Sequence, residues 1–245
     1  MLTRLQSSQL TIKLAKTIFG KATVTYLGHE VGNGRVRPKD ANISAIHEYP
    51  APTTRKALRR FLGMAGYYRR FCPNFAAATL PLTQLTSGAV RYHWNEECQA
   101  AFDQLKNFLA QGPVLIAPDF TMPFSLQTDA SDVALGAVLL QEMEGILHPV
   151  AYHSSKLNAH QKRYSTIEKE LLAIVSAIQK FQCYLQPTQE PLQIYTDHNP
   201  LAFLNRSKFT NQRLLRWSLF LQPYHLNVNH IKRRENIIAD ALSRI

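Results

Sequence analysis

The sequence predicts an α/β fold: a mixed five-stranded sheet flanked by helices, preceded by a small, mainly helical module with a short β-hairpin. The chain has 245 residues, of which 45% are hydrophobic, which is ample for a real core and long enough for two domains. Apolar residues recur at helical spacing up to residue 112 and alternate between strand and helix patterns after residue 124. Three prolines in residues 113–123 indicate a linker between modules 1–112 and 124–245.

The first module begins with strands and continues with helices. Residues 10–37 predict short strands, and the Val-Gly-Asn-Gly segment at 31–34 is typical of a hairpin turn. A short helix is predicted over 39–48. A longer helix is expected to begin after Thr54, a suitable N-cap, and a third after Asn95.

The second module alternates strands and helices. Strands are expected near 124–129, 133–141, 148–154, 192–196 and 225–231, and helices over 165–185, within 199–221 and over 236–244. Tight connections between the first three strands predict antiparallel pairing. The helical crossover to the fourth strand predicts a parallel addition.

Charge is unevenly distributed along the chain. The formal net charge is +11 and the pI is about 9.7. Residues 1–80 hold 13 Lys or Arg against 3 Asp or Glu, so most of the excess lies in the first third. This basic module is either a solvated surface or a contact surface for a polyanion, and the motifs described below favour the second.

Cysteine content and hydropathy bear on the compartment. The three cysteines, Cys72, Cys98 and Cys183, are widely spaced and match no metal or disulfide pattern, which favours a reducing, intracellular compartment, cytoplasmic or nuclear. No run of about 18 apolar residues predicts a membrane span, and the first residues lack the apolar core of a signal peptide.

Four acidic residues lie in apolar settings at the ends of predicted elements. Asp129 and Asp197 end predicted strands, within Thr-Asp-Ala-Ser and Tyr-Thr-Asp-His. Glu170 heads the core-facing stripe of the helix over 165–185, and Asp240 lies one turn into the last helix. Taken singly, each could be a strand-end turn residue or an acid that complements a helix N-terminus.

Together, the four acids indicate a metal site. Burying a carboxylate is unfavourable unless it is paired or metal-bound, and the strand order predicts that all four converge at one sheet edge. Oxygen-only ligands favour Mg²⁺ or Mn²⁺, and two such ions can promote hydrolysis of a phosphodiester. The chain contains no Walker A loop, no Gly-x-Ser-x-Gly elbow and no His-Glu-x-x-His motif.

Several long motifs resemble the reverse transcriptase–ribonuclease H region of gypsy-type LTR retrotransposons. Tyr-Leu-Gly-His at 26–29 resembles the primer-grip segment of that family, and Phe-Leu-Gly-Met-Ala-Gly-Tyr-Tyr-Arg-Arg-Phe at 61–71 resembles its thumb signature. The segments 128–132, 168–173 and 236–244 resemble blocks of its ribonuclease H domain. The resemblance covers nearly the whole chain.

The resemblance implies a function and assigns residues to it. The implied substrate is RNA paired with DNA, of which the RNA strand is cut, and the implied ligands of two Mg²⁺ or Mn²⁺ ions are Asp129, Glu170, Asp197 and Asp240. His230 would correspond to a mobile histidine that assists proton transfer or product departure; an ordinary polar residue at an exposed strand end is an equal alternative. Implied nucleic-acid contacts are Tyr67, Arg69 and Arg70. Independently of the resemblance, the basic run Lys232, Arg233 and Arg234 near His230 could hold the nucleic-acid backbone or be a solvated loop.

Two departures from the family pattern leave alternatives open. The polymerase motif Tyr-x-Asp-Asp is absent, so we expect no DNA polymerisation without a polymerase-containing subunit in trans. Residues 232–234 replace the usual Pro-Gly-Lys turn. A non-catalytic nucleic-acid-binding remnant is the main alternative. An integrase-type strand-transfer enzyme is disfavoured, because such sites use Asp, Asp and Glu in that order.

Overall fold

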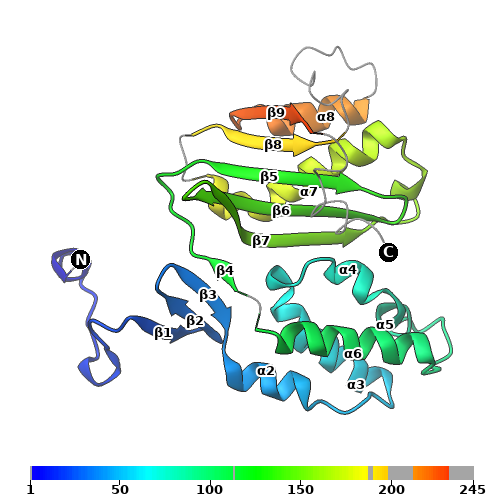
Figure 1. Ribbon diagram of the computed structural model, residues 1–245, viewed down its shortest axis with the longest axis horizontal. Coiled ribbons are helices and arrows are strands. Elements are labelled where there is room, and N and C mark those ends of the chain that lie inside the picture. Colours follow the sequence, from blue (N-terminus) through cyan, green and yellow to red (C-terminus); the bar gives the residue numbers. More distant parts are fainter. Residues whose placement is uncertain (1, 113, 187–189, 198–211, 232–245) are drawn as a thin grey trace.

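The structure, a computed structural model, describes residues 2–112, 114–186, 190–197 and 212–231. It contains a four-stranded sheet of order β1-β2-β3-β4 and a five-stranded sheet of order β7-β6-β5-β8-β9 (Figure 1). Asp240, Lys232, Arg233, Arg234 and the helix expected over 236–244 lie outside the described residues.

The smaller sheet is antiparallel throughout. Its strands are β1 (Thr23–Tyr26), β2 (His29–Gly32), β3 (Arg35–Pro38) and β4 (Leu115–Ile116), preceded by α1 (Leu2–Ser7) and the 3₁₀ turn η1 (Leu14–Lys16). The expected turn joins β2 to β3, where Asn33 and Gly34 have φ of 50° and 68°, the left-handed pair that a tight hairpin requires. β4 falls within the predicted linker and pairs with β3. The division into modules stays a prediction.

Helices pack beside this sheet around one apolar core. They are α2 (Asp40–His47), α3 (Arg55–Tyr67), the 3₁₀ turn η2 (Arg69–Phe71), α4 (Phe75–Ala78), α5 (Leu80–Gln84) and α6 (Glu96–Ala110). As expected, the side chains of Thr54 and Asn95 cap α3 and α6 by accepting from the backbone N–H groups of Ala57 and Cys98. Phe61 and Phe102 meet between these two helices with ring centroids 4.5 Å apart.

The larger sheet has the predicted mixed topology. Its strands are β5 (Phe124–Ala130), β6 (Ala134–Met143), β7 (Ile146–Lys156), β8 (Leu192–Thr196) and β9 (Leu226–His230). The neighbours β5, β6 and β7 are antiparallel, whereas β8 is parallel to both β5 and β9. β6 and β7 extend beyond the predicted ranges because Glu144 and Gly145, with φ of 53° and 79°, form a tight turn between them. The expected α/β fold is confirmed.

In the described part of the chain, two helices cover one face of this sheet. The helices are α7 (Thr166–Leu185), which follows the 3₁₀ turn η3 (Gln161–Arg163), and α8 (Gln212–Leu221); both lie behind the strands in Figure 1. Side chains of α7, such as Ile174, Ile178 and Phe181, pack against Leu126 of β5 and Ile194 of β8. Residues 198–211 precede α8 and lie outside the described residues, so the first part of the helical region expected over 199–221 is not described.

The edge strand β7 contacts the helices of the N-terminal part of the chain. Ser154 of β7, which is 3% exposed, accepts a hydrogen bond on its side chain from the backbone N–H of Ala76, at 2.9 Å. Lys156 donates to the hydroxyl of Thr83. The two halves of the chain therefore meet across a surface that includes buried polar contacts. Among the described residues, no helix has the length and apolarity needed to cross a bilayer.

Candidate metal centre

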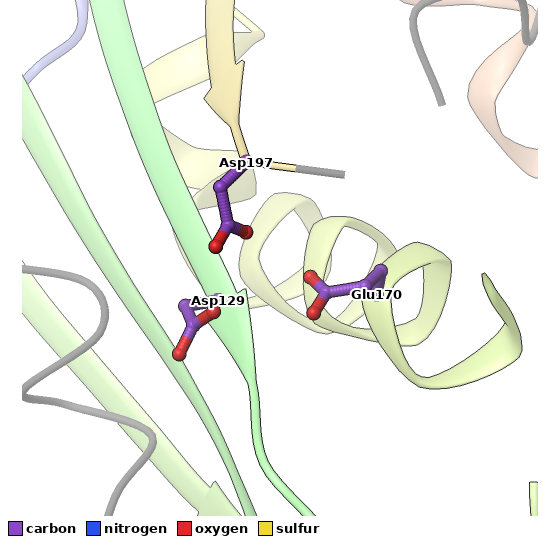
Figure 2. A group of neighbouring side chains, drawn as sticks. All are labelled: Asp129, Glu170 and Asp197. Atoms are coloured by element: carbon purple, nitrogen blue, oxygen red, sulfur yellow. The ribbon is translucent and has the colours of Figure 1, made fainter. Parts of the chain in front are cut away.

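Three of the four predicted acids meet at one end of the five-stranded sheet. Asp129 lies near the end of β5, Asp197 follows β8 directly, and Glu170 faces both from α7 (Figure 2). One carboxylate oxygen from each lies within 4.8 Å of the other two. Because β5 and β8 are parallel neighbours, their carboxyl ends lie at the same edge, as the sequence predicted.

The chemistry of this cluster fits a divalent cation. Asp129 and Glu170 are 5% and 4% exposed, and Asp197 is partly exposed, so water can reach the group from one side. Three ionised carboxylates at this spacing repel one another, and a shared cation removes that repulsion. All donors are carboxylate oxygens, the ligand type that Mg²⁺ and Mn²⁺ prefer over softer metals. Asp240, the fourth predicted ligand, lies outside the described residues.

The first turn of α7 sets the direction of Glu170. The helix begins with a capping box, in which Ser165 accepts from the backbone N–H of Glu168 and the Glu168 carboxylate accepts from the backbone N–H of Ser165. Glu168 also accepts from the guanidinium of Arg213 on α8, at 2.6 Å. The same guanidinium lies over the Tyr164 ring, 3.9 Å from its centroid. The start of α7 is thus fixed from two sides.

A second ion pair joins α7 to the turn after β5. Lys169, whose side chain is 10% exposed, donates to Asp132 at 2.7 Å. The hydrogen bond and charge of Lys169 lower the pKa of the Asp132 carboxyl. No role was predicted from the sequence for Lys169, Asp132 or Arg213. A lysine directly before the buried Glu170 on an apolar helix was the available signal, because a buried ammonium needs a partner.

His230 lies beside the cluster, at the end of β9. Its ring Nε2 is 3.2 Å from the backbone oxygen of Asp197, and the side chain is exposed. The parallel pairing of β8 with β9 places Thr196 opposite His230, so the histidine and Asp197 leave the sheet at the same edge.

Three of the six predicted nucleic-acid contacts, Tyr67, Arg69 and Arg70, lie in the N-terminal part of the chain. Tyr67, which is 52% exposed, donates its hydroxyl hydrogen to the backbone oxygen of Leu27. Arg70 lies over the ring of Phe71, 5.3 Å from its centroid. Arg69 donates to the backbone oxygen of Ser154 on β7, at 2.7 Å. None of these three belongs to the carboxylate cluster.

Comparison with known proteins gives one family and a set of transposon relatives. The family described as the RNase H-like domain found in reverse transcriptase matches residues 119–224. The retrovirus-related Pol polyprotein from transposon 297 of Drosophila melanogaster is 41% identical over 244 residues, which are 99% of this chain and 22% of that protein. The transposon Tf2-3 polyprotein of Schizosaccharomyces pombe is 39% identical over 248 residues, 100% of this chain and 19% of that protein. The chain therefore spans about a fifth of the length of these relatives.

Solved structures with the same fold include foamy viral protease–reverse transcriptases. A complex with RNA/DNA hybrid has a TM-score of 0.72 at 22% identity, covering 87% of this chain and 30% of that one. A complex with double-stranded DNA has a TM-score of 0.73 at 21% identity, covering 87% and 45%. These likenesses concern the fold. The transposon relatives and the matched family confirm the resemblance: the chain is similar to the reverse transcriptase region of retrotransposon Pol polyproteins, and its residues 119–224 match the RNase H-like domain found in reverse transcriptase.

Proposed function

We propose that this chain hydrolyses the RNA strand of RNA–DNA hybrids as a metal-dependent endonuclease. The observation that carries the proposal is the cluster of Asp129, Glu170 and Asp197, in which one carboxylate oxygen from each residue lies within 4.8 Å of the other two. The similarity to retrotransposon Pol polyproteins and the matched RNase H-like domain support the substrate class. Asp240 is proposed as a fourth ligand on the sequence motif alone.

The proposed chemistry assigns a role to each residue. Asp129, Glu170, Asp197 and Asp240 would hold two Mg²⁺ or Mn²⁺ ions, and these would supply activation of a water and stabilisation of the leaving oxygen in an in-line phosphodiester displacement. Asp129 and Asp197 hold their carboxylates on strand ends, which limits their movement. Glu170 closes the ligand set from the helix side. His230, beside the backbone of Asp197, accepts or returns a proton as the product leaves.

The proposed substrate contacts combine basic charge with an exposed aromatic ring. The excess of Lys and Arg in residues 1–80 favours a polyanion, and Tyr67 and Arg70 are proposed to contact sugar and phosphate. Arg69 is proposed as a further phosphate contact, and Lys232, Arg233 and Arg234 as contacts beside the catalytic end. Such contacts position a duplex without reading its sequence. We further propose that polymerisation depends on a polymerase-containing subunit in trans.

A cleavage assay tests the proposal directly. The purified chain is incubated with a labelled RNA–DNA hybrid in Mg²⁺, in Mn²⁺ and in EDTA, with double-stranded RNA and double-stranded DNA as controls. We expect cleavage of the hybrid alone, only with a metal, and a loss of about 100-fold or more in Asp129→Asn. Asp103→Asn, an exposed acid on α6, is the matched control. Hybrid cleavage by Asp129→Asn at the wild-type rate would refute the assignment, and salt-sensitive binding without turnover would favour the non-catalytic alternative.

A further inference from the structure

The spacing of the metal-binding carboxylates depends on how two elements pack that are distant in the chain. Asp129 belongs to β5 and Glu170 to α7, and β6, β7 and η3 separate them in the chain. Ionised carboxylates at these two positions repel each other, which opposes the close approach of this end of α7 to the end of β5. Apolar packing holds the body of α7 on the sheet, and a polar contact close to both ligands can further fix the helix end.

The turn after β5 is closed by hydrogen bonds and carries Asp132. Ser131 accepts on its hydroxyl from the backbone N–H groups of Val133 and Ala134, at 3.3 and 3.0 Å. The backbone N–H of Ser131 donates to the oxygen of Ala134, at 2.9 Å. Asp132 therefore stands on a closed turn that begins where β5 ends, three residues after Asp129.

Lys169 reaches this turn from the other element. Its backbone N–H donates to Ser165, so the residue lies inside the first turn of α7, and its ammonium contacts Asp132 at 2.7 Å. The Lys169 side chain is 10% exposed, whereas that of Asp132 is 95% exposed. The side chain of Lys169 is therefore mostly buried, and its ammonium group contacts the turn after β5. Lys169 immediately precedes Glu170 in the sequence.

We propose that Lys169 and Asp132 are positioning residues: their ion pair holds the Glu170 end of α7 against the Asp129 end of β5 and thereby sets the spacing of the metal-binding carboxylates. The proposal rests on the proposed function for the identity of the ligands. It does not require a large contribution to folding, because an ion pair with one exposed partner adds little stability. Its effect is on geometry, where contacts just outside a metal's ligands change affinity or activity about 10- to 100-fold.

Metal affinity distinguishes positioning from a simple effect of charge. Removing Asp132 takes away a negative charge, and removing Lys169 takes away a positive one. If charge alone mattered, Asp132→Asn would bind Mn²⁺ more weakly and Lys169→Met would bind it more tightly. If the ion pair positions the ligands, both variants bind Mn²⁺ more weakly, by about ten-fold. The double variant should then bind Mn²⁺ with about the same affinity as the weaker-binding single variant, because all three variants lose the same ion pair.

The experiment titrates each purified protein with Mn²⁺ and measures free ion by electron paramagnetic resonance, with hybrid cleavage against Mg²⁺ concentration as a second readout. Lys169→Arg keeps the cation and should retain affinity within about three-fold, well inside the loss expected for Lys169→Met. Glu30→Gln and Arg37→Met are the control variants: each removes one partner of the β2–β3 ion pair, which lies away from the cluster. They match the loss of negative charge in Asp132→Asn and of positive charge in Lys169→Met. Thermal melting checks folding, and Asp132→Asn keeps the test valid if Lys169→Met fails to fold.

The outcomes separate this inference from the proposed function. Unchanged Mn²⁺ affinity in Asp132→Asn, tighter binding by Lys169→Met, or a wild type that binds no Mn²⁺ would overturn the positioning role. Weaker binding by both variants in a wild-type background that binds Mn²⁺ without cutting hybrids would support positioning and refute the nuclease assignment. Hybrid cleavage by the wild type, together with unchanged Mn²⁺ affinity in both variants, would support the nuclease assignment and refute the positioning role.

Discussion

Arg69 of η2 donates to the backbone oxygen of Ser154 on β7, at 2.7 Å, so an arginine expected to contact phosphate holds the edge of the larger sheet. The guanidinium also lies over the ring of Phe75, 5.7 Å from its centroid. The Ser154 side chain in turn accepts from the backbone N–H of Ala76 at the start of α4. A single residue of β7 is therefore bonded to both η2 and α4.

Ser154→Ala should destabilise the protein. The substitution leaves the buried N–H of Ala76 without its acceptor, and an unsatisfied buried donor costs about 1–3 kcal/mol. Urea unfolding measures the change in free energy. Ser155→Ala, at the next and half-buried position of β7, is the control and should change stability by less than about 0.5 kcal/mol. Equal effects of the two substitutions would mean that the bond to Ala76 contributes nothing.

Divalent metal should stabilise the wild type and not the Asp197→Asn variant. A ligand that binds only the folded state stabilises it by about 2.7 kcal/mol at 100 times its dissociation constant. Without metal, Asp197→Asn should be at least as stable as the wild type, because it removes one of three mutually repelling charges. Thermal melts with EDTA, Mg²⁺ and Mn²⁺ measure both effects. Equal Mn²⁺ stabilisation of the two proteins would exclude Asp197 as a ligand.

Local signals in the sequence account for the parts of the fold that were predicted. Thr54 and Asn95 cap the expected helices because a short polar side chain before an apolar stripe is sufficient to start a helix. Asp129 and Asp197 were placed at one edge because parallel strands end together, and the close approach of Glu170 followed from its position on the core-facing stripe of α7.

Contacts between distant segments could not be predicted in this way. The two-residue strand β4 pairs with β3, yet nothing in Leu115 or Ile116 specifies a partner so far back in the chain. The bonds of Arg69 to Ser154 and of Lys169 to Asp132 likewise depend on the packed structure. An arginine on a basic helical segment has the same local pattern whether it contacts phosphate or a carbonyl, so sequence alone cannot separate these roles.

Stability should fall in acid partly through His153. Burial, together with the charges of Arg69 and Lys180, lowers the pKa of His153 from 6.5 to about 4. The unfolded chain therefore binds a proton between these values while the folded chain does not, so stability is retained above pH 6.5 and lost as the pH falls toward 4. The full loss is about 3 kcal/mol. His153→Gln should lose this part of the pH dependence in urea unfolding between pH 7 and pH 4, and parallel curves for the two proteins would contradict it.

Replacing Arg213 by alanine should destabilise the protein, and replacing it by lysine should restore only part of the stability. Its guanidinium bonds Glu168 and stacks on Tyr164, joining α8 to the start of α7. Arg213→Ala removes both contacts and should destabilise by about 1–3 kcal/mol. Arg213→Lys keeps the charge and loses the planar stacking, so an intermediate loss is expected. Arg216→Ala on the exposed part of α8 is the control in thermal melts. A lysine variant as stable as the wild type would show that charge alone suffices.

Two adjacent arginines of α3 should differ in their effect on the salt dependence of hybrid binding. Arg59 donates to the backbone oxygen of Thr86 at 2.6 Å, which occupies its guanidinium within the protein. Arg60 is exposed, and its side chain makes no hydrogen bond to any residue that the structure describes. Each phosphate contact contributes about 0.7–0.9 to the slope of log K against log salt concentration. Arg60→Ala should therefore reduce that slope by about this amount, whereas Arg59→Ala should leave it unchanged. Fluorescence anisotropy with a labelled hybrid measures both slopes, and equal reductions would mean that Arg59 exchanges Thr86 for phosphate on binding.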